Sequence, residues 1–187
     1  MIDPHHTLAY QEGNDEEALN YFHQALEKYP HSAVTLRQMA LIYIKRNDVV
    51  KAQELLRKSI QIDPFLIESR LNLAEIYHLQ GRFPAAQRLY EDILAIDPSY
   101  ETAYFRLVQL CLASGNFPRA LELAQKILKE SSDVSQLVNI GALLAQYQYK
   151  DLALAFFDKA VHSDPHDIRL KPLIEQAQNY LLTNSKK

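Results

Sequence analysis

The chain has 187 residues, and 20 Lys and Arg stand against 23 Asp and Glu, so its formal net charge is −3. This slightly acidic balance argues against a protein that binds the phosphate backbone of nucleic acids. No apolar run approaches the ~20 residues of a membrane-spanning helix, and no charged start precedes an apolar signal segment. The single cysteine, Cys111, cannot form an internal disulfide. We therefore expect a cytoplasmic chain without a membrane-inserted segment.

A repeat of about 34 residues organises the sequence. Alanines recur at spacings of 34, 34, 34 and 33 residues, namely Ala18, Ala52, Ala86, Ala120 and Ala153. Mostly apolar side chains follow each alanine at four and seven residues, which is the spacing of one face of an α-helix. Prolines close four segments at the same period, namely Pro30, Pro64, Pro98 and Pro165. The proline that the period lacks would fall near Ser131 or Ser132. The chain is therefore predicted to consist of helical repeats.

The predicted elements, in chain order, are five helix pairs, one further helix and a tail. Their bounds are about 1–32, 33–66, 67–100, 101–133 and 134–167 for the pairs, 168–182 for a C-terminal capping helix and 183–187 for the tail. The first pair is short at its front, because its first helix begins only at Asp3 and Pro4. A terminal repeat without a full cap frays or finds a partner, so we expect either fraying or a homodimer through this repeat.

Each pair carries a turn residue between its two helices. Glycine or asparagine occupies this position in the first four pairs, as Gly13, Asn47, Gly81 and Gly115. These residues accept the left-handed conformation that ends a helix. The fifth pair has Gln148 instead, so we expect its turn to be built differently. Pro84 and Pro118 each open a following helix, where the missing N–H of proline is tolerated.

Helix, Gly turn, helix and Pro turn at a 34-residue period resemble the tetratricopeptide repeat (TPR) family over about residues 4–167. The resemblance implies an all-α, right-handed solenoid of antiparallel helix-turn-helix repeats, and it brings no catalytic residues. The glycines all have structural explanations, and Cys111 lies in an apolar stripe that we expect to be buried. We therefore expect a chain that is not an enzyme and holds no cofactor and no metal.

The first helix of each pair has a second face, opposite its core stripe, that mixes apolar, amide and charged side chains. The candidate residues on this face are Arg37, Gln38, Leu41, Leu71, Asn72, Glu75, Phe105, Arg106, Gln109, Val138 and Asn139. A face that meets only water would be polar throughout. The resemblance implies that this face lines a concave groove that holds an extended peptide or a partner helix. The sequence therefore predicts a non-enzymatic adaptor that binds other proteins.

Two finer patterns lie within this face. The column Gln38, Asn72, Arg106 and Asn139 is similar to the amide ladder of O-linked N-acetylglucosamine transferases, and such side chains can bond a peptide backbone. Arg37, Asn72 and Arg106 also occupy three columns of the carboxylate clamp of heat-shock co-chaperones. However, Leu41 and Thr102 replace an asparagine and a lysine of that clamp, and Glu75 adds a repelling charge.

Two alternatives remain open at this point. The chain could be a co-chaperone-type receptor for an acidic C-terminal tail, which a degenerate clamp would hold. It could instead be the regulatory repeat region of a larger enzyme, or a self-assembling scaffold.

Overall fold

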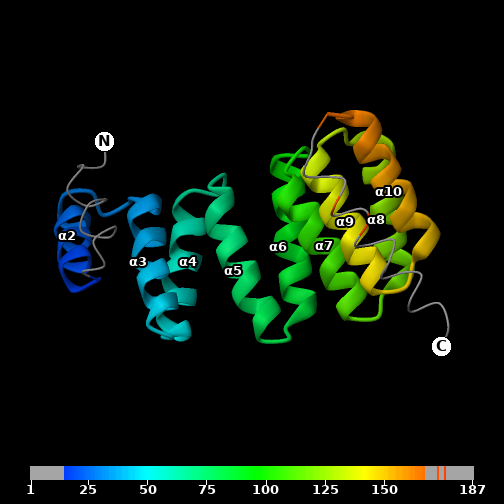
Figure 1. Ribbon diagram of the computed structural model, residues 1–187. Helices are drawn as coiled ribbons and strands as arrows, with labels where there is room; N and C mark the ends of the chain where they lie inside the picture. Colours follow the sequence, from blue (N-terminus) through cyan, green and yellow to red (C-terminus); the bar gives the residue numbers. More distant parts are fainter. Residues whose placement is uncertain (1–14, 167–171, 173–174, 176–187) are drawn as a thin grey trace. The chain divides into compact units, whose positions relative to one another are not determined.

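In the computed structural model, residues 15–166 together with Pro172 and Glu175 are described, and the regular elements among them are α-helices (Figure 1). The helices are α2 (Asp15–Lys28), α3 (Ala33–Lys45), α4 (Val49–Ile62), α5 (Ile67–Leu79), α6 (Phe83–Ile96), α7 (Glu101–Ala113), α8 (Phe117–Glu130), α9 (Val134–Gln146) and α10 (Lys150–Ser163). The predicted all-α class of helix-turn-helix repeats is confirmed.

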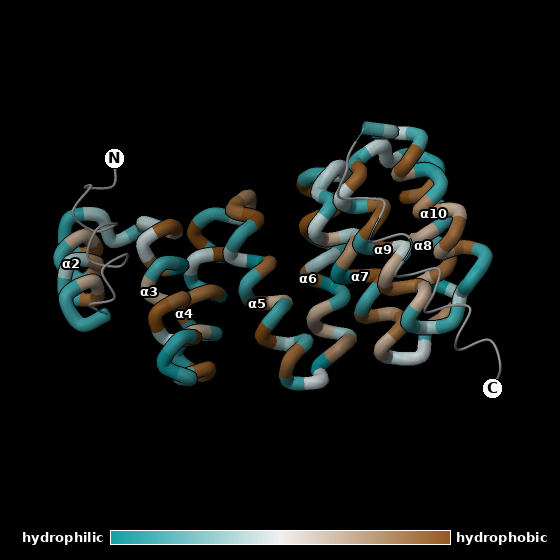
Figure 2. Tube along the Cα trace, viewed as in Figure 1, coloured by the Kyte–Doolittle hydropathy of each residue, from teal (hydrophilic) through white to brown (hydrophobic). Residues whose placement is uncertain are grey.

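The chain forms two compact units, Met1–Pro98 and Ser99–Lys187. In the first unit, each of the helices α2 to α5 packs against the next one in sequence. In the second unit, α7 packs against both α8 and α9, and α10 packs closely against α9. Each unit buries apolar side chains of its own helices. Figure 2 shows hydrophobic and hydrophilic segments alternating along these helices.

The same turn joins the two helices of each complete pair. The turn residue has a positive φ in all of them, 61° at Asn47, 71° at Gly81, 76° at Gly115 and 66° at Gln148. The next residue donates its N–H to a carbonyl five positions earlier, for example Arg82 to Tyr77 at 2.8 Å and Tyr149 to Leu144 at 3.0 Å. This is a Schellman motif. The expectation of a differently built turn at Gln148 is therefore wrong, because the backbone bonds hold a glutamine in the glycine conformation.

Helix starts follow the local chemistry of the sequence. The side chains of Ser32, Asp48 and Asp133 accept hydrogen bonds from backbone N–H groups in the first turns of α3, α4 and α9. Pro84 and Pro118 occupy the first turns of α6 and α8, as predicted. Asp133 begins α9 shortly after the position where the proline is missing, so a capping carboxylate defines that helix start.

The core follows the predicted alanine column. Each of these alanines is fully buried, namely Ala18, Ala52, Ala86, Ala120 and Ala153. Cys111 is buried too, as expected. The predicted first helix and most of the predicted capping helix lie outside the described residues. The predicted dimer contact through the first repeat involves that part of the chain and stays a prediction.

Candidate functional site

The inner face of unit 1 consists of the six candidate residues on α3 and α5. They are Arg37, Gln38, Leu41, Leu71, Asn72 and Glu75, and each is half-buried. Their core-side neighbours Leu36, Met39, Leu73 and Ala74 are buried. The two sides of α3 and α5 therefore differ as the sequence predicts, and the inner face keeps access to solvent.

A hydrogen bond joins two repeats across this face. The Nε of Arg37 on α3 donates to Oδ1 of Asn72 on α5 at 3.0 Å. The bond uses one of the five N–H donors of the guanidinium, so the terminal nitrogens keep donors that can reach a ligand. Since the Asn72 carbonyl accepts from Arg37, its NH₂ group is the part that can donate to a peptide carbonyl. Leu41 and Leu71 supply apolar surface on the same two helices.

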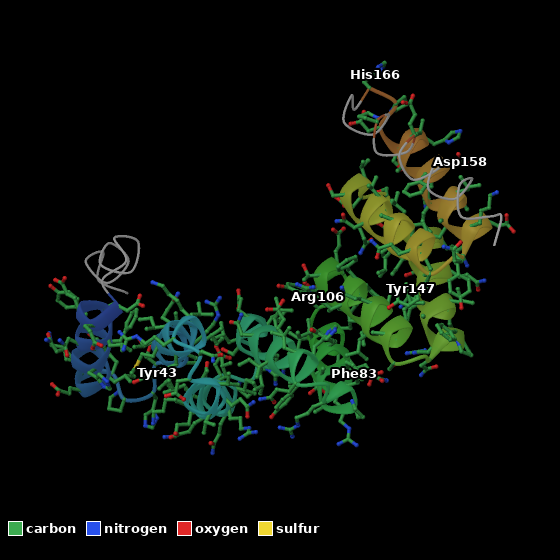
Figure 3. The ribbon with its side chains drawn as sticks, turned by 60° about the horizontal axis from the view of Figure 1, so that its bottom comes forward. Tyr43, Phe83, Arg106, Tyr147, Asp158 and His166 are labelled. Carbon is green, nitrogen blue, oxygen red and sulfur yellow. The ribbon has the colours of Figure 1, made fainter. Side chains whose placement is uncertain are left out.

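The inner face of unit 2 consists of Phe105, Arg106 and Gln109 on α7 and of Val138 and Asn139 on α9. The Nη1 of Arg106 donates to Oε1 of Gln109 at 3.2 Å, so this bond stays within one helix. The Cζ of Arg106, which Figure 3 labels on α7, lies 5.9 Å from the centroid of the Phe105 ring. This distance is within the range of a cation–π contact. The arginine and the aromatic ring are both half-buried and lie next to each other on α7.

The two candidates on α9 differ from each other. Asn139 is exposed, whereas Val138 is only 9% exposed and belongs to the core. The expectation that Val138 provides an open apolar anchor is therefore wrong, because a neighbouring side chain or backbone covers almost all of it. Asn139 remains available as a polar contact.

The clamp pattern is only partly assembled. Arg37 and Asn72 are hydrogen-bonded, so two of its three matching columns meet within unit 1. Leu41 offers no donor where the clamp has an asparagine, and the exposed Thr102 on α7 carries no charge where the clamp has a lysine. Charge-assisted hydrogen bonds are the strong part of such a site. The charged donor set of the clamp is therefore incomplete.

The sequence pattern did not single out a second group of polar contacts in unit 1. Arg57 on α4 donates from Nη2 to the hydroxyl of Tyr77 on α5 at 2.8 Å. The Cζ of Arg82 lies 4.4 Å from the centroid of the same ring. These residues come from three segments and share no repeat column. Residues 32–60 hold six basic and two acidic side chains. This basic excess includes Arg57, but it does not indicate where the charges meet.

Among the described residues, no group of three or more His, Cys, Asp and Glu side chains is placed to hold a metal ion. In the same part of the chain, no helix is both long and apolar enough to cross a membrane.

Solved structures of repeat proteins share this fold. MamA superposes with a TM-score of 0.70 at 20% identity, covering 90% of this chain and 99% of MamA. YrrB, described as a TPR protein with an unusual peptide-binding site, superposes with a TM-score of 0.59 at 17% identity, covering 88% of this chain and 85% of YrrB. At such low identity these similarities show the fold alone.

Sequence comparison adds one curated relative and a family. Photosystem I assembly protein Ycf3 of Cyanophora paradoxa is 36% identical over 76 residues, which are 39% of this chain and 44% of Ycf3. The chain thus spans less than half the length of that relative. The sequence profile of the tetratricopeptide repeat matches residues 9–65, 51–99 and 77–147. Because these matches together extend over most of the sequence, the chain belongs to the tetratricopeptide repeat family.

Proposed function

We propose that this protein is a non-enzymatic adaptor that binds a peptide or helix of a partner protein through its inner faces. The observation that carries the proposal is the hydrogen bond between Arg37 and Asn72. It holds two donor-bearing side chains from consecutive repeats in fixed positions on a face that is half open to solvent. Groups held in place before binding lose less conformational entropy when the ligand arrives.

The inner face of unit 1 supplies both parts of a peptide site. The terminal nitrogens of Arg37 and the NH₂ group of Asn72 donate to backbone carbonyls of the ligand. Leu41 and Leu71 contact an apolar side chain of the ligand, since both are half-buried and lose further surface on binding.

In unit 2, Phe105 and Arg106 form the corresponding contact. An aromatic ring with a guanidinium beside it is typical of binding hot spots, because it combines apolar area with directed donors. The exposed Asn139 adds a donor and an acceptor on the neighbouring helix.

Two relatives support this function. The description of YrrB names a peptide-binding site in the same fold, and the name of Ycf3 describes a protein that assists the assembly of a larger complex. An adaptor that holds a segment of a client protein fits both. We therefore propose that the partners are proteins, and that assembly or scaffolding is the cellular role.

A receptor for an acidic C-terminal tail is the second candidate. Arg37 and Asn72 favour it because they meet in clamp positions. The two candidates differ in what the ligand must contain. A tail receptor loses its ligand when the terminal carboxylate is amidated, whereas a backbone-binding face does not.

Photocrosslinking of displayed peptides tests the proposal. A benzophenone side chain replaces Leu71 on the inner face or, as the control, Phe65, which lies in the turn before the same helix and is 76% exposed. Peptides selected from a random library on the unmodified protein are then irradiated with each variant. We expect crosslinks from position 71 and few from position 65. Equal or greater crosslinking at Phe65 would show that peptides bind outside the inner face.

A further inference from the structure

The contacts around Tyr77 combine two positive charges that no acid among the described residues neutralises. The Arg57 guanidinium bonds the Tyr77 hydroxyl at 2.8 Å, and the Arg82 guanidinium lies over the ring at 4.4 Å from its centroid. Both arginines are exposed, while Tyr77 is only 7% exposed. Within the described residues, neither arginine forms an ion pair with a carboxylate. Two like charges at one ring repel each other unless an anion joins them.

The nearest acid on α4 is already engaged. Glu54 binds Lys51 at 3.1 Å and Lys58 at 2.9 Å. Hydrogen bonds from these two lysines also lower the pKa of Glu54, Lys58 contributing the larger effect, so the carboxylate stays ionised and paired. It therefore does not serve Arg57, which lies on the same helix.

The turn after α5 fixes the position of Arg82. The Arg82 N–H donates to the Tyr77 carbonyl at 2.8 Å, and Gly81 before it has a φ of 71°. This Schellman geometry folds the side chain of Arg82 back over Tyr77. The same turn position holds Asp48, Asn116 and Tyr149 in the other pairs, so the cation is particular to this one.

An exposed aliphatic side chain lies on the same face of α4 as Arg57. Val50 is seven residues before Arg57, which places the two on one face of the helix two turns apart, and it is 82% exposed. The Gln53 side-chain amide donates to the Gln80 side-chain oxygen at 3.0 Å, which ties the first half of α4 to the end of α5. The edge formed by Val50, Arg57 and Arg82 thus presents cations and apolar surface together. Phe83, which Figure 3 labels, begins α6 directly after this edge.

We propose that this edge binds an acidic amphipathic segment of a partner protein, with a carboxylate or phosphorylated side chain held between Arg57 and Arg82. The planar donors of two guanidiniums suit such an anion. Val50 contacts an apolar side chain of the segment, for which a nucleic-acid backbone has no counterpart. A membrane surface is disfavoured, because two arginines fall short of the roughly four to eight basic residues of lipid-binding clusters.

This site is separate from the inner face. Tyr77 belongs to the core side of α5, whereas Asn72 and Leu71 lie on its inner face, about 140° away around the helix for a separation of five residues. A variant of one site therefore leaves the side chains of the other unchanged, and the two proposals fail independently.

An NMR titration with a short synthetic peptide of Glu and Leu tests the proposal in the unmodified protein. The same peptide with Gln in place of Glu is the neutral control. We expect the acidic peptide to shift the side-chain Nε–Hε signals of Arg57 and Arg82, and the neutral peptide to leave them in place. Unchanged signals with the acidic peptide would overturn the proposal. The same holds if phosphatidylserine vesicles or a single-stranded oligonucleotide shift the signals at lower concentration than the peptide.

Matched variants separate the site from general charge attraction. The double change Arg57→Gln and Arg82→Gln removes two charges at the edge. The control, Lys28→Gln and Arg88→Gln, removes two exposed charges elsewhere in unit 1. We expect the dissociation constant of the acidic peptide to rise roughly tenfold in the first variant and to stay within about twofold in the second. Equal weakening in both variants would contradict a specific site.

Discussion

The inner faces of the two units use the same repeat columns but organise them differently. In unit 1, Arg37 and Asn72 bond across two helices at 3.0 Å. In unit 2, Arg106 bonds Gln109 on its own helix at 3.2 Å, and its guanidinium lies over the adjacent ring of Phe105. The neighbouring helix α9 contributes the exposed Asn139, whose side chain makes no hydrogen bond within the described part of the chain.

The two inner faces differ in the hydrogen-bond partner of the arginine. Arg37 meets an amide oxygen in the next repeat, so its position couples α3 to α5. In unit 2 the two corresponding positions on α9 hold the buried Val138 and the exposed Asn139. The side-chain hydrogen bond from Arg106 to Gln109 lies within α7. Unit 1 thus presents an inner face with fixed donors, and unit 2 presents an aromatic and cationic pair with an open amide.

The largest expected change in stability tests the repeat register that the two units share. Ala86 and Ala120 are fully buried in equivalent positions of α6 and α8. We expect Ala86→Leu and Ala120→Leu to lower the free energy of unfolding by about 1–3 kcal/mol each, because the added methyl groups overpack the helix contact. Denaturant unfolding measures the change, with the exposed positions Ala95→Leu and Gln125→Leu as controls on the same helices. A buried variant as stable as its control would refute the shared repeat register.

The next largest expected change in the free energy of unfolding comes from the turn residues, and it differs between the two units. Gln148 holds a φ of 66°, which a glutamine adopts at a cost that glycine avoids. We expect Gln148→Gly in unit 2 to raise the free energy of unfolding by about 0.5–1 kcal/mol. Asn47→Gly in unit 1 should change it by only about a few tenths of a kcal/mol, since asparagine tolerates this conformation. No gain in the free energy of unfolding from Gln148→Gly would show that strain at Gln148 is absent.

Double-mutant cycles measure the contrast between the inner faces directly. We expect a coupling free energy of about 0.5–1.5 kcal/mol between Arg37 and Asn72, which are half-buried and bonded across helices. For Arg106 and Gln109, spaced three residues apart on one helix, about 0.2–0.5 kcal/mol is expected. Thermal unfolding of the Arg→Met and amide→Ala variants provides the four values of each cycle. A larger coupling in unit 2 would invert the comparison.

The smallest expected effects come from two acids, Glu54 and Glu101, whose pKa values shift in opposite directions. Hydrogen bonds from Lys58 and Lys51 lower the pKa of Glu54 in unit 1 below its ordinary 4.5. Burial, followed by the charge of Asp133, raises the pKa of Glu101 in unit 2 above 4.5. Glu54 therefore stabilises the fold above pH 4.5, and this contribution is lost as the pH falls through its lowered pKa.

Glu101 behaves in the opposite way. Its ionised form is unfavourable in the fold, so the destabilisation is complete above its raised pKa and is relieved as the pH falls toward 4.5. An NMR titration of the carboxyl carbons should place Glu54 below Glu101. Consistently, Glu54→Gln should lower the stability at neutral pH and Glu101→Gln should raise it. The reverse order of the two pKa values would show that the acids are not in these environments.

Much of the fold was predictable because one physical pattern recurs. The buried alanines, the left-handed turn at Gly81 and the prolines of α6 and α8 each depend on local backbone geometry, and the period repeats that signal along the chain. The prediction of a different turn at Gln148 was wrong, because the backbone hydrogen bonds of the Schellman motif, rather than the residue type, impose its conformation.

The candidate site was less predictable. Column spacing correctly separated the inner face from the core at Arg37, Asn72 and Phe105. It did not reveal that Val138 is covered, since burial depends on which neighbours pack above a residue. Nor could it reveal that Arg57 and Arg82 meet at Tyr77, because that contact joins three segments through side-chain conformations.

The affinity of a selected peptide for one double variant tests the central claim most directly. A peptide obtained from a random library on the unmodified protein is measured against Phe105→Ala with Arg106→Ala. It is also measured against a control with Phe117→Ala and Arg119→Ala, which removes the same two side-chain types from α8. We predict that the inner-face variant keeps its melting temperature and loses a few kcal/mol of binding free energy, since each hot spot typically contributes about 2 kcal/mol or more. The control should bind as the original does. A peptide that binds the inner-face variant unchanged, while the α8 variant loses it, would contradict the account.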